Sequence, residues 1–113
     1  MVRSKLIMKT VCNHYGVKLE EVLCDGRKQP YVLYRQVLQY FLCKQYGPTK
    51  AGRMTDRGHD TVIYARDVIK SFCWTTPEFD DEISDINNKI SLIVNKVSKM
   101  NPLLGWLYVT FIL

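Results

Sequence analysis

The stretch Arg57-Gly-His-Asp-Thr-Val-Ile-Tyr-Ala-Arg-Asp-Val-Ile-Lys70 decides the fold of this chain. Its apolar residues recur at helical spacing, so one side of a helix is predicted to lie against a core. The residues on this inner side are Val62, Ala65, Ile69 and Phe72. The first turn carries three short polar side chains, those of His59, Asp60 and Thr61. A helix with an apolar inner side and a polar start is therefore predicted from about residue 58 onward.

A shorter helix is predicted directly upstream, in Pro48-Thr-Lys-Ala-Gly-Arg-Met54. A helix, a tight turn and a second helix with a polar start form a helix-turn-helix. At such a start, short polar side chains can reach base edges while the positive end of the helix dipole faces phosphate. The pattern therefore favours a DNA-binding protein.

The same residues resemble a known family. The family is the C-terminal DNA-binding domain of DnaA, the bacterial replication initiator. Its core motif is R-x-H-x-T-V-x-x-A, and it is matched by Arg57, His59, Thr61, Val62 and Ala65. Gly52 matches the glycine that precedes this motif in the family. Three segments further upstream resemble other parts of this family and follow one another in the same order. They are residues 11–23, the basic pair Arg27-Lys28 and the run Tyr34-Arg35-Gln36-Val37. The resemblance covers about residues 5–72. It implies an all-α helix-turn-helix bundle of the DnaA C-terminal or Trp-repressor-like type, here with an extra C-terminal helix.

The chain departs from the family at the start of the second helix. The family has Asp, His, Thr, Thr there, whereas positions 58–61 are Gly, His, Asp, Thr. The turn carries Met54-Thr-Asp56 in place of the family's Phe-Gly-Gly. Because Asp60 places an acid where a threonine is expected, the fold is predicted to persist while the DNA sequence preference changes.

The resemblance implies a set of DNA contacts. Arg27, in the loop before the long helix, is expected to enter the minor groove, and a guanidinium on a loop suits a narrow A·T-rich groove. His59 and Thr61 are expected to contact bases or phosphates, with helix capping as the alternative. Arginines and lysines that frame the motif are expected to hold phosphates, with a plain surface charge as the alternative. The predicted DNA-binding residues are Arg27, Lys28, Arg35, Lys50, Arg53, Arg57, His59, Asp60 and Thr61.

Composition agrees with one folded domain. The chain has 113 residues, is 47% hydrophobic and carries a formal charge of +5. Residues 1–75 hold 13 Lys/Arg against 6 Asp/Glu, a balance of +7, and residues 76–113 hold 3 against 5, a balance of −2. The basic excess thus falls on the helix-turn-helix segment, as a phosphate-binding surface requires.

The cysteines argue against a metal site. Cys12, Cys24, Cys43 and Cys73 are widely spaced without a C-x-x-C pair, and only two histidines accompany them. Three of them lie in apolar helical stretches, where cysteine behaves as a small buried hydrophobe. We expect a reduced, cytoplasmic protein with no metal or cofactor. The basic start has no apolar run of signal-peptide type after it.

Further helices are predicted along the chain. The spacing predicts helices over 3–14, 19–23 and 31–46, ended by turns at Gly16, at Asp25-Gly26 and at Gly47-Pro48. Thr76 and Pro77 are a cap and a first residue for a final helix. The predicted organisation is a DNA-binding domain at 1–75, an amphipathic helix at 76–101 and an apolar tail at 102–113. The almost wholly apolar run 103–113 has eleven residues, too few to span a membrane.

The final helix carries an apolar seam with heptad spacing, formed by Phe79, Ile83, Ile86, Ile90, Ile93, Val97 and Met100. Two interpretations are open. The seam covers the core of its own domain, or it pairs with a second copy in a homodimer through the residues from Phe79 to Val97.

No catalytic set is found. The phosphate-binding loop of an ATPase is absent from the sequence, and the acids at positions 80–82 suit a helix start. The first hypothesis is therefore a sequence-specific double-stranded-DNA-binding protein without ATPase activity, acting in replication initiation, its regulation or transcription. The alternative is a helical interaction protein that works through the seam and the tail. Salt dependence separates the two, because phosphate contacts weaken steeply with salt.

Overall fold

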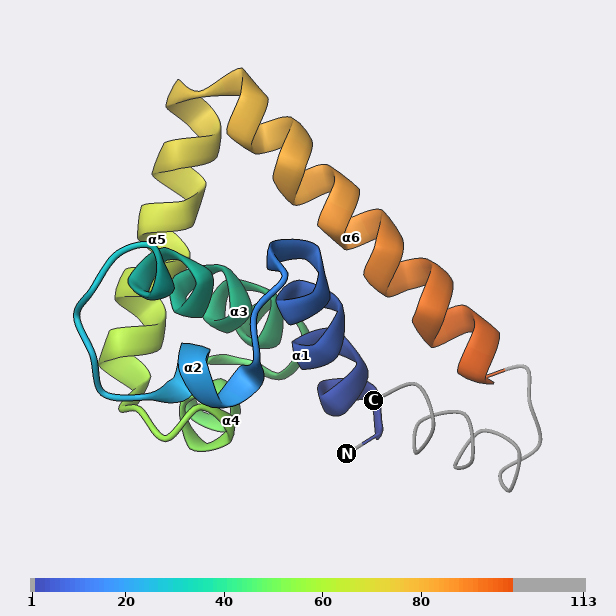
Figure 1. The fold of residues 1–113 in the computed structure, drawn as a ribbon, viewed down its shortest axis with the longest axis horizontal. Coiled ribbons are helices and arrows are strands. Elements are labelled where there is room, and N and C mark those ends of the chain that lie inside the picture. Colours follow the sequence, from blue (N-terminus) through green and yellow to red (C-terminus); the bar gives the residue numbers. More distant parts are fainter. Residues whose placement is uncertain (1, 99–113) are drawn as a thin grey trace.

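The computed structural model describes residues 2–98, and the regular structure in this range is entirely α-helical (Figure 1). The helices in chain order are α1 (Val2–Tyr15), α2 (Leu19–Leu23), α3 (Tyr31–Tyr46), α4 (Pro48–Met54), α5 (His59–Thr75) and α6 (Pro77–Ser98). The prediction of an all-α fold is confirmed. The predicted bounds of α2 and α3 agree with the structure, and α1 is longer than predicted by one residue at each end.

The junction between α3 and α4 depends on the Gly47-Pro48 pair. Gly47 has a φ of +87°, in the left-handed region that glycine adopts at little cost. Its N–H donates to the carbonyl of Cys43 at 2.8 Å and closes the last turn of α3. Pro48 then begins α4, where a missing N–H leaves no hydrogen bond unmade. The chain can therefore turn sharply between the two helices.

Helix α3 is the centre of the core. It packs against α1, α2, α4 and α5, and its stripe Val37, Leu38 and Leu42 is fully buried. The inner residues predicted for the first helix, Leu6, Ile7, Val11 and Cys12, are buried as well. Each such aliphatic side chain stabilises the fold by about 1.5–3 kcal/mol. The core thus holds α3 and the helix-turn-helix in one unit.

The inner side of α5 is confirmed over its first half. Val62, Ala65 and Ile69 are buried. Phe72, predicted to join them, is 37% exposed and stacks on Phe79 with ring centroids 4.1 Å apart. The reason is that the C-terminal part of α5 extends past α3 to the corner where α6 begins (Figure 1). Phe72 therefore covers the edge of the core and not its interior.

The seam of α6 covers the core of its own chain along its first half. Helix α6 packs on α5 and then runs past α1 (Figure 1). Phe79, Ile83 and Ile86 are buried, and Ile90 is partly buried against the same core. Ile93 and Val97 are partly buried. The first of the two interpretations of the seam therefore holds from Phe79 to Ile86, and Met100 lies outside the described residues.

Polar contacts also fasten α6 to α1. Nε2 of His14 lies 3.3 Å from Oε1 of Glu82, and the hydroxyl of Tyr15 donates to Oε2 of Glu82 at 3.4 Å. Burial, and then the neighbouring Glu82 carboxylate, raise the pKa of Tyr15. Nζ of Lys89 lies 3.1 Å from Nδ1 of His14 and 3.1 Å from Oδ2 of Asp85. Glu82 is thus a contact between helices as well as an acid near a helix start.

The cysteines are mostly buried, as their apolar surroundings in the sequence predict. Cys12 and Cys43 are buried, Cys73 is partly buried and Cys24 is exposed, and all four are free thiols. Burial raises the pKa of the Cys12 thiol.

Among residues 2–98, no helix is long and apolar enough to cross a membrane. The apolar tail at 102–113 lies outside the described residues.

Candidate nucleic-acid interface

The turn between α4 and α5 is built around Gly52. The N–H of Arg57 donates to the Gly52 carbonyl at 2.8 Å. A Cβ atom at position 52 would lie 2.5 Å from the carbonyl oxygen of Arg57, so only glycine permits this approach. The buried hydroxyl of Thr55 donates to the Ala51 carbonyl at 2.9 Å. The angle between the two helices is therefore fixed by backbone contacts across the turn.

Asp56 occupies the one strained position in this turn. Its φ is +54°, in the left-handed region, where a side chain costs free energy. Aspartate is among the few residues other than glycine that adopt this conformation. The replacement of the family's second glycine by Asp56 is therefore accommodated, and the turn keeps its course.

The start of α5 is exposed and polar. His59, Asp60 and Thr61 all lie on the surface, and Nε2 of His59 lies 3.0 Å from Oδ1 of Asp60. Gly58 precedes the helix with extended backbone and offers no side-chain cap. Tyr64, one turn further along and 66% exposed, lies on the same side as Asp60. Tyr64 is not among the DNA-binding residues predicted from the sequence, although its i+4 spacing from Asp60 is a signal for it.

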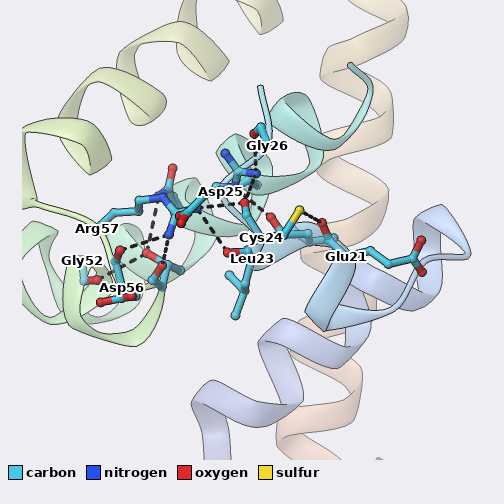
Figure 2. A network of polar contacts seen from close by, with 12 residues as sticks. Glu21, Leu23, Cys24, Asp25, Gly26, Gly52, Asp56 and Arg57 are labelled. Atoms are coloured by element: carbon cyan, nitrogen blue, oxygen red, sulfur yellow. Dashed lines mark hydrogen bonds and ion pairs between the residues drawn. The ribbon is translucent and has the colours of Figure 1, made fainter. Parts of the chain in front are cut away.

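Arg57 connects this turn to a second segment. Its Nη2 donates to the carbonyls of Leu23 and Cys24 at 3.2 and 3.0 Å, at the end of α2 (Figure 2). Its Nη1 donates to the carbonyls of Thr55 and Asp56 at 3.1 and 3.0 Å. The side chain is 16% exposed and also lies 3.5 Å from the carboxylate of Asp25. Arg57 therefore joins the turn of the helix-turn-helix to the loop that follows α2.

Arg35 reaches the same loop from α3. Its Nε donates to the carbonyl of Val22 at 2.8 Å, and its Nη2 to those of Cys24 and Gly26 at 2.6 and 3.0 Å. Arg35 is buried, and this burial, followed by the positive charge of Arg57, lowers its pKa. The carbonyls at a helix C-terminus carry partial negative charge, which favours such cations. Arg35 and Arg57 together hold the loop 24–30.

Two of the expected phosphate-binding residues have backbone carbonyls as their hydrogen-bond partners. Arg35 and Arg57 are predicted from the sequence to hold phosphates, with a plain surface charge as the alternative. Their guanidinium groups instead lie against backbone carbonyls, because the end of α2 and its loop pack beside the turn 55–58. Their direct effect is to position backbone.

The loop that they hold carries Arg27 and Lys28, and both are exposed. On the other side of the turn, Lys50 and Arg53 are exposed on α4. The structure thus brings the exposed start of α5, the basic loop and the basic outer side of α4 around the turn 55–58 (Figure 1). Among the described residues, no group of three or more His, Cys, Asp or Glu could hold a metal ion.

A short α4, a tight turn around Gly52 and an α5 with an exposed polar start define a helix-turn-helix protein. The family model described as "Bacterial dnaA protein helix-turn-helix" matches residues 4–69, from α1 into α5. The chain therefore belongs to the bacterial DnaA helix-turn-helix family, a family of DNA-binding domains, and the resemblance found in the sequence is confirmed. That family model describes a DNA-binding module.

Similar proteins carry the name chromosomal replication initiator protein DnaA. The one from Magnetococcus marinus is 33% identical over 93 residues, which cover 79% of this chain and 21% of that protein. The one from Flavobacterium psychrophilum is 33% identical over 92 residues, covering 76% and 19%. The one from Kosmotoga olearia is 37% identical over 67 residues, covering 58% and 15%. The chain thus spans about a fifth of the length of the first two of these relatives, and less of the third.

Proposed function

We propose that this chain binds double-stranded DNA in a sequence-specific manner, at sites of the kind that replication initiators recognise, and acts in replication initiation or its regulation. Membership of the family and the names of the relatives support the class of target. The observation that carries the proposal furthest is the set of bonds from Arg57 to the end of α2, because they join the start of α5 to the basic loop.

The start of α5 enters the major groove in this proposal. Thr61 offers a methyl group to thymine and a hydroxyl to a base edge, and His59 donates to a base acceptor or a phosphate. Asp60 accepts from an exocyclic amino group of cytosine. Because the carboxylate of Asp60 lies 3.0 Å from the His59 ring, the two side chains act as a pair.

The loop 24–30 faces the adjacent minor groove. Arg27 inserts into a narrow, A·T-rich groove, where the negative potential is greatest, and Lys28 contacts the nearby phosphates. Lys50 and Arg53, exposed on α4, bind phosphates on the other side of the turn. Arg35 and Arg57 contribute by holding the loop at a fixed distance from α5, so both grooves are read in one register.

Salt dependence tests this proposal against the alternative of a protein-interaction module. Each phosphate contact changes the log–log slope of affinity against salt by roughly 0.9 for duplex DNA. We expect a steep slope for the wild type and a slope shallower by about one for Lys50→Gln. The matched control is Lys5→Gln, which removes the same charge from the exposed surface of α1. Duplex affinity that does not change with salt would contradict the proposal.

A further inference from the structure

Three hollows on the outer side of α3 share lining residues and form one groove. The largest, about 590 Å³, lies between α3, α5 and α6. The second, about 390 Å³, lies between α1, α3 and α6, and the third, about 370 Å³, lies between α3, α4 and α5. Lys44 lines all three, while Tyr40 and Phe41 each line two. We refer to these joined hollows as the α3 groove.

The charge of the α3 groove is mostly positive. Its cations come from three helices and are Arg3, Lys44, Arg66 and Lys70. Asp80 is the one carboxylate among the described residues that line these three hollows, and, after burial, its negative charge raises the pKa of the Cys73 thiol. A polyanion can therefore follow the groove with little repulsion.

The side of α6 that lines the groove is mostly polar, and Asp80 is its one charged residue among those described. Its residues there include Ser84, Asn87, Asn88, Ser91 and Asn95. The other acids of this helix, Glu78, Asp81, Glu82 and Asp85, line none of the three hollows. Apart from Asp80 and a few apolar side chains, this acid-rich helix thus presents hydroxyls and amides to the groove, and these groups donate and accept hydrogen bonds.

A large aromatic side chain lies at the rim of the groove. Trp74, at the end of α5, is 90% exposed and lines the largest hollow together with Lys70. Tyr40 lines the same hollow from α3. An aromatic face beside lysines is a platform on which an unstacked base can lie.

We propose that the α3 groove binds single-stranded nucleic acid. Trp74 stacks on a base, Lys44 and Lys70 contact successive phosphates, and the Ser/Asn side of α6 hydrogen-bonds to sugars or base edges. This activity goes beyond the proposed binding of duplex DNA and uses other residues. The two proposals can therefore fail separately.

The geometry favours a single strand over a duplex at this site. Fifteen helical positions separate His59 from Trp74, which corresponds to about 22 Å along α5. A duplex seated on the start of α5 keeps its bases stacked inside and offers no base face to Trp74. A single strand exposes the faces of its bases, and proteins bind such strands with a basic groove and aromatic platforms.

The test measures binding of the full chain to a fluorescent thymidine homopolymer of about 12 nucleotides, a length that one binding groove can accommodate. Trp74→Ala should weaken this binding roughly tenfold, and Trp74→Phe should retain most of the affinity. Replacing both Lys44 and Lys70 with Gln should make the log–log salt slope shallower by about 1.4, because single strands lose roughly 0.7 per contact. Circular dichroism checks that each variant is folded.

Two controls separate this groove from general charge and from the duplex site. Lys5→Gln combined with Lys18→Gln removes the same charge at exposed positions outside the α3 groove and should leave the slope unchanged. Arg27→Ala should weaken duplex binding only. The proposal is overturned if Trp74→Ala binds the homopolymer as the wild type does, or if the control pair loses as much as the groove pair. It is also overturned if the wild type shows no binding at low salt.

Discussion

Two pairs of basic residues around the same loop have opposite surroundings. Arg27 and Lys28 lie on its exposed side, with their charges in solvent. Arg35 and Arg57 lie on its inner side, where seven hydrogen bonds join them to backbone carbonyls. A basic residue near a DNA-binding motif can therefore be bound to backbone, and in the proposed function such a residue holds the segment that contacts DNA. Burial and hydrogen-bond partners separate the two pairs, and residue type does not.

The largest effect that the comparison predicts is on stability, at the inner pair. Arg35→Ala removes three charge-assisted bonds and leaves the buried Val22 carbonyl without its side-chain donor. We expect the free energy of unfolding to fall by about 3 kcal/mol. Urea denaturation measures the loss. Arg35→Lys is the matched variant, and it should recover little because an ammonium cannot reproduce the fork of the guanidinium. A loss below about 0.5 kcal/mol would mean that Arg35 does not hold the loop.

Arg57→Ala should act on both stability and binding. The variant releases the turn 55–58 from the end of α2, so we expect a loss of about 2 kcal/mol in stability. Duplex affinity should also fall at a temperature where the protein remains folded, because the loop is no longer held in register with α5. Unchanged affinity together with reduced stability would confine Arg57 to folding.

Asp60 offers a change in specificity at the exposed start of α5. Asp60→Thr should move the preferred base at the position facing residue 60 away from cytosine, with a discrimination of about 1–3 kcal/mol. Competition between duplexes that differ at each position in turn measures this shift. Identical preferences for the two proteins would show that Asp60 does not face a base.

Arg27→Ala is the counterpart of Arg35→Ala on the outer side of the loop. Because Arg27 is exposed, its removal should change the free energy of unfolding by less than about 0.5 kcal/mol. Duplex affinity should fall, and the preference for an A·T-rich flank should relax. A variant with unchanged affinity and the same preferred site would remove Arg27 from the interface.

The smallest expected effect is a gain in stability at the turn. Asp56 has a φ of +54°, so Asp56→Gly relieves the strain of a side chain in the left-handed region. We expect a gain of about 0.5–1 kcal/mol in thermal or urea unfolding, with duplex binding retained. A loss of stability would show that the Asp56 side chain makes a contribution larger than the strain.

The sequence predicted the helices well because their limits are local. Gly47-Pro48 ends one helix and begins the next through the conformations that those two residues allow, and the stripe of α3 follows from periodicity alone. Gly52 could be singled out by the family resemblance. Glycine is needed there because the backbone of Arg57 leaves no room for a Cβ atom.

The features that the sequence could not predict depend on the placement of helices. The partners of Arg35 are carbonyls nine to thirteen positions upstream, and no spacing rule connects them. Phe72 matches the inner pattern of α5, but the C-terminal part of α5 extends beyond the core at this residue. The Ser/Asn side of α6 can be assigned to a groove only once the structure shows that it faces α3 and Trp74.

Selection of bound duplexes from a random pool by the wild-type protein tests the central claim most directly. We expect enrichment of one motif, read in the major groove by the start of α5, with an A·T-rich flank read by Arg27. Repeating the selection with Arg27→Ala should keep the motif and lose the flank. A wild-type pool that shows no enrichment over the input, at a salt concentration where the protein still binds duplex DNA, would contradict sequence-specific binding.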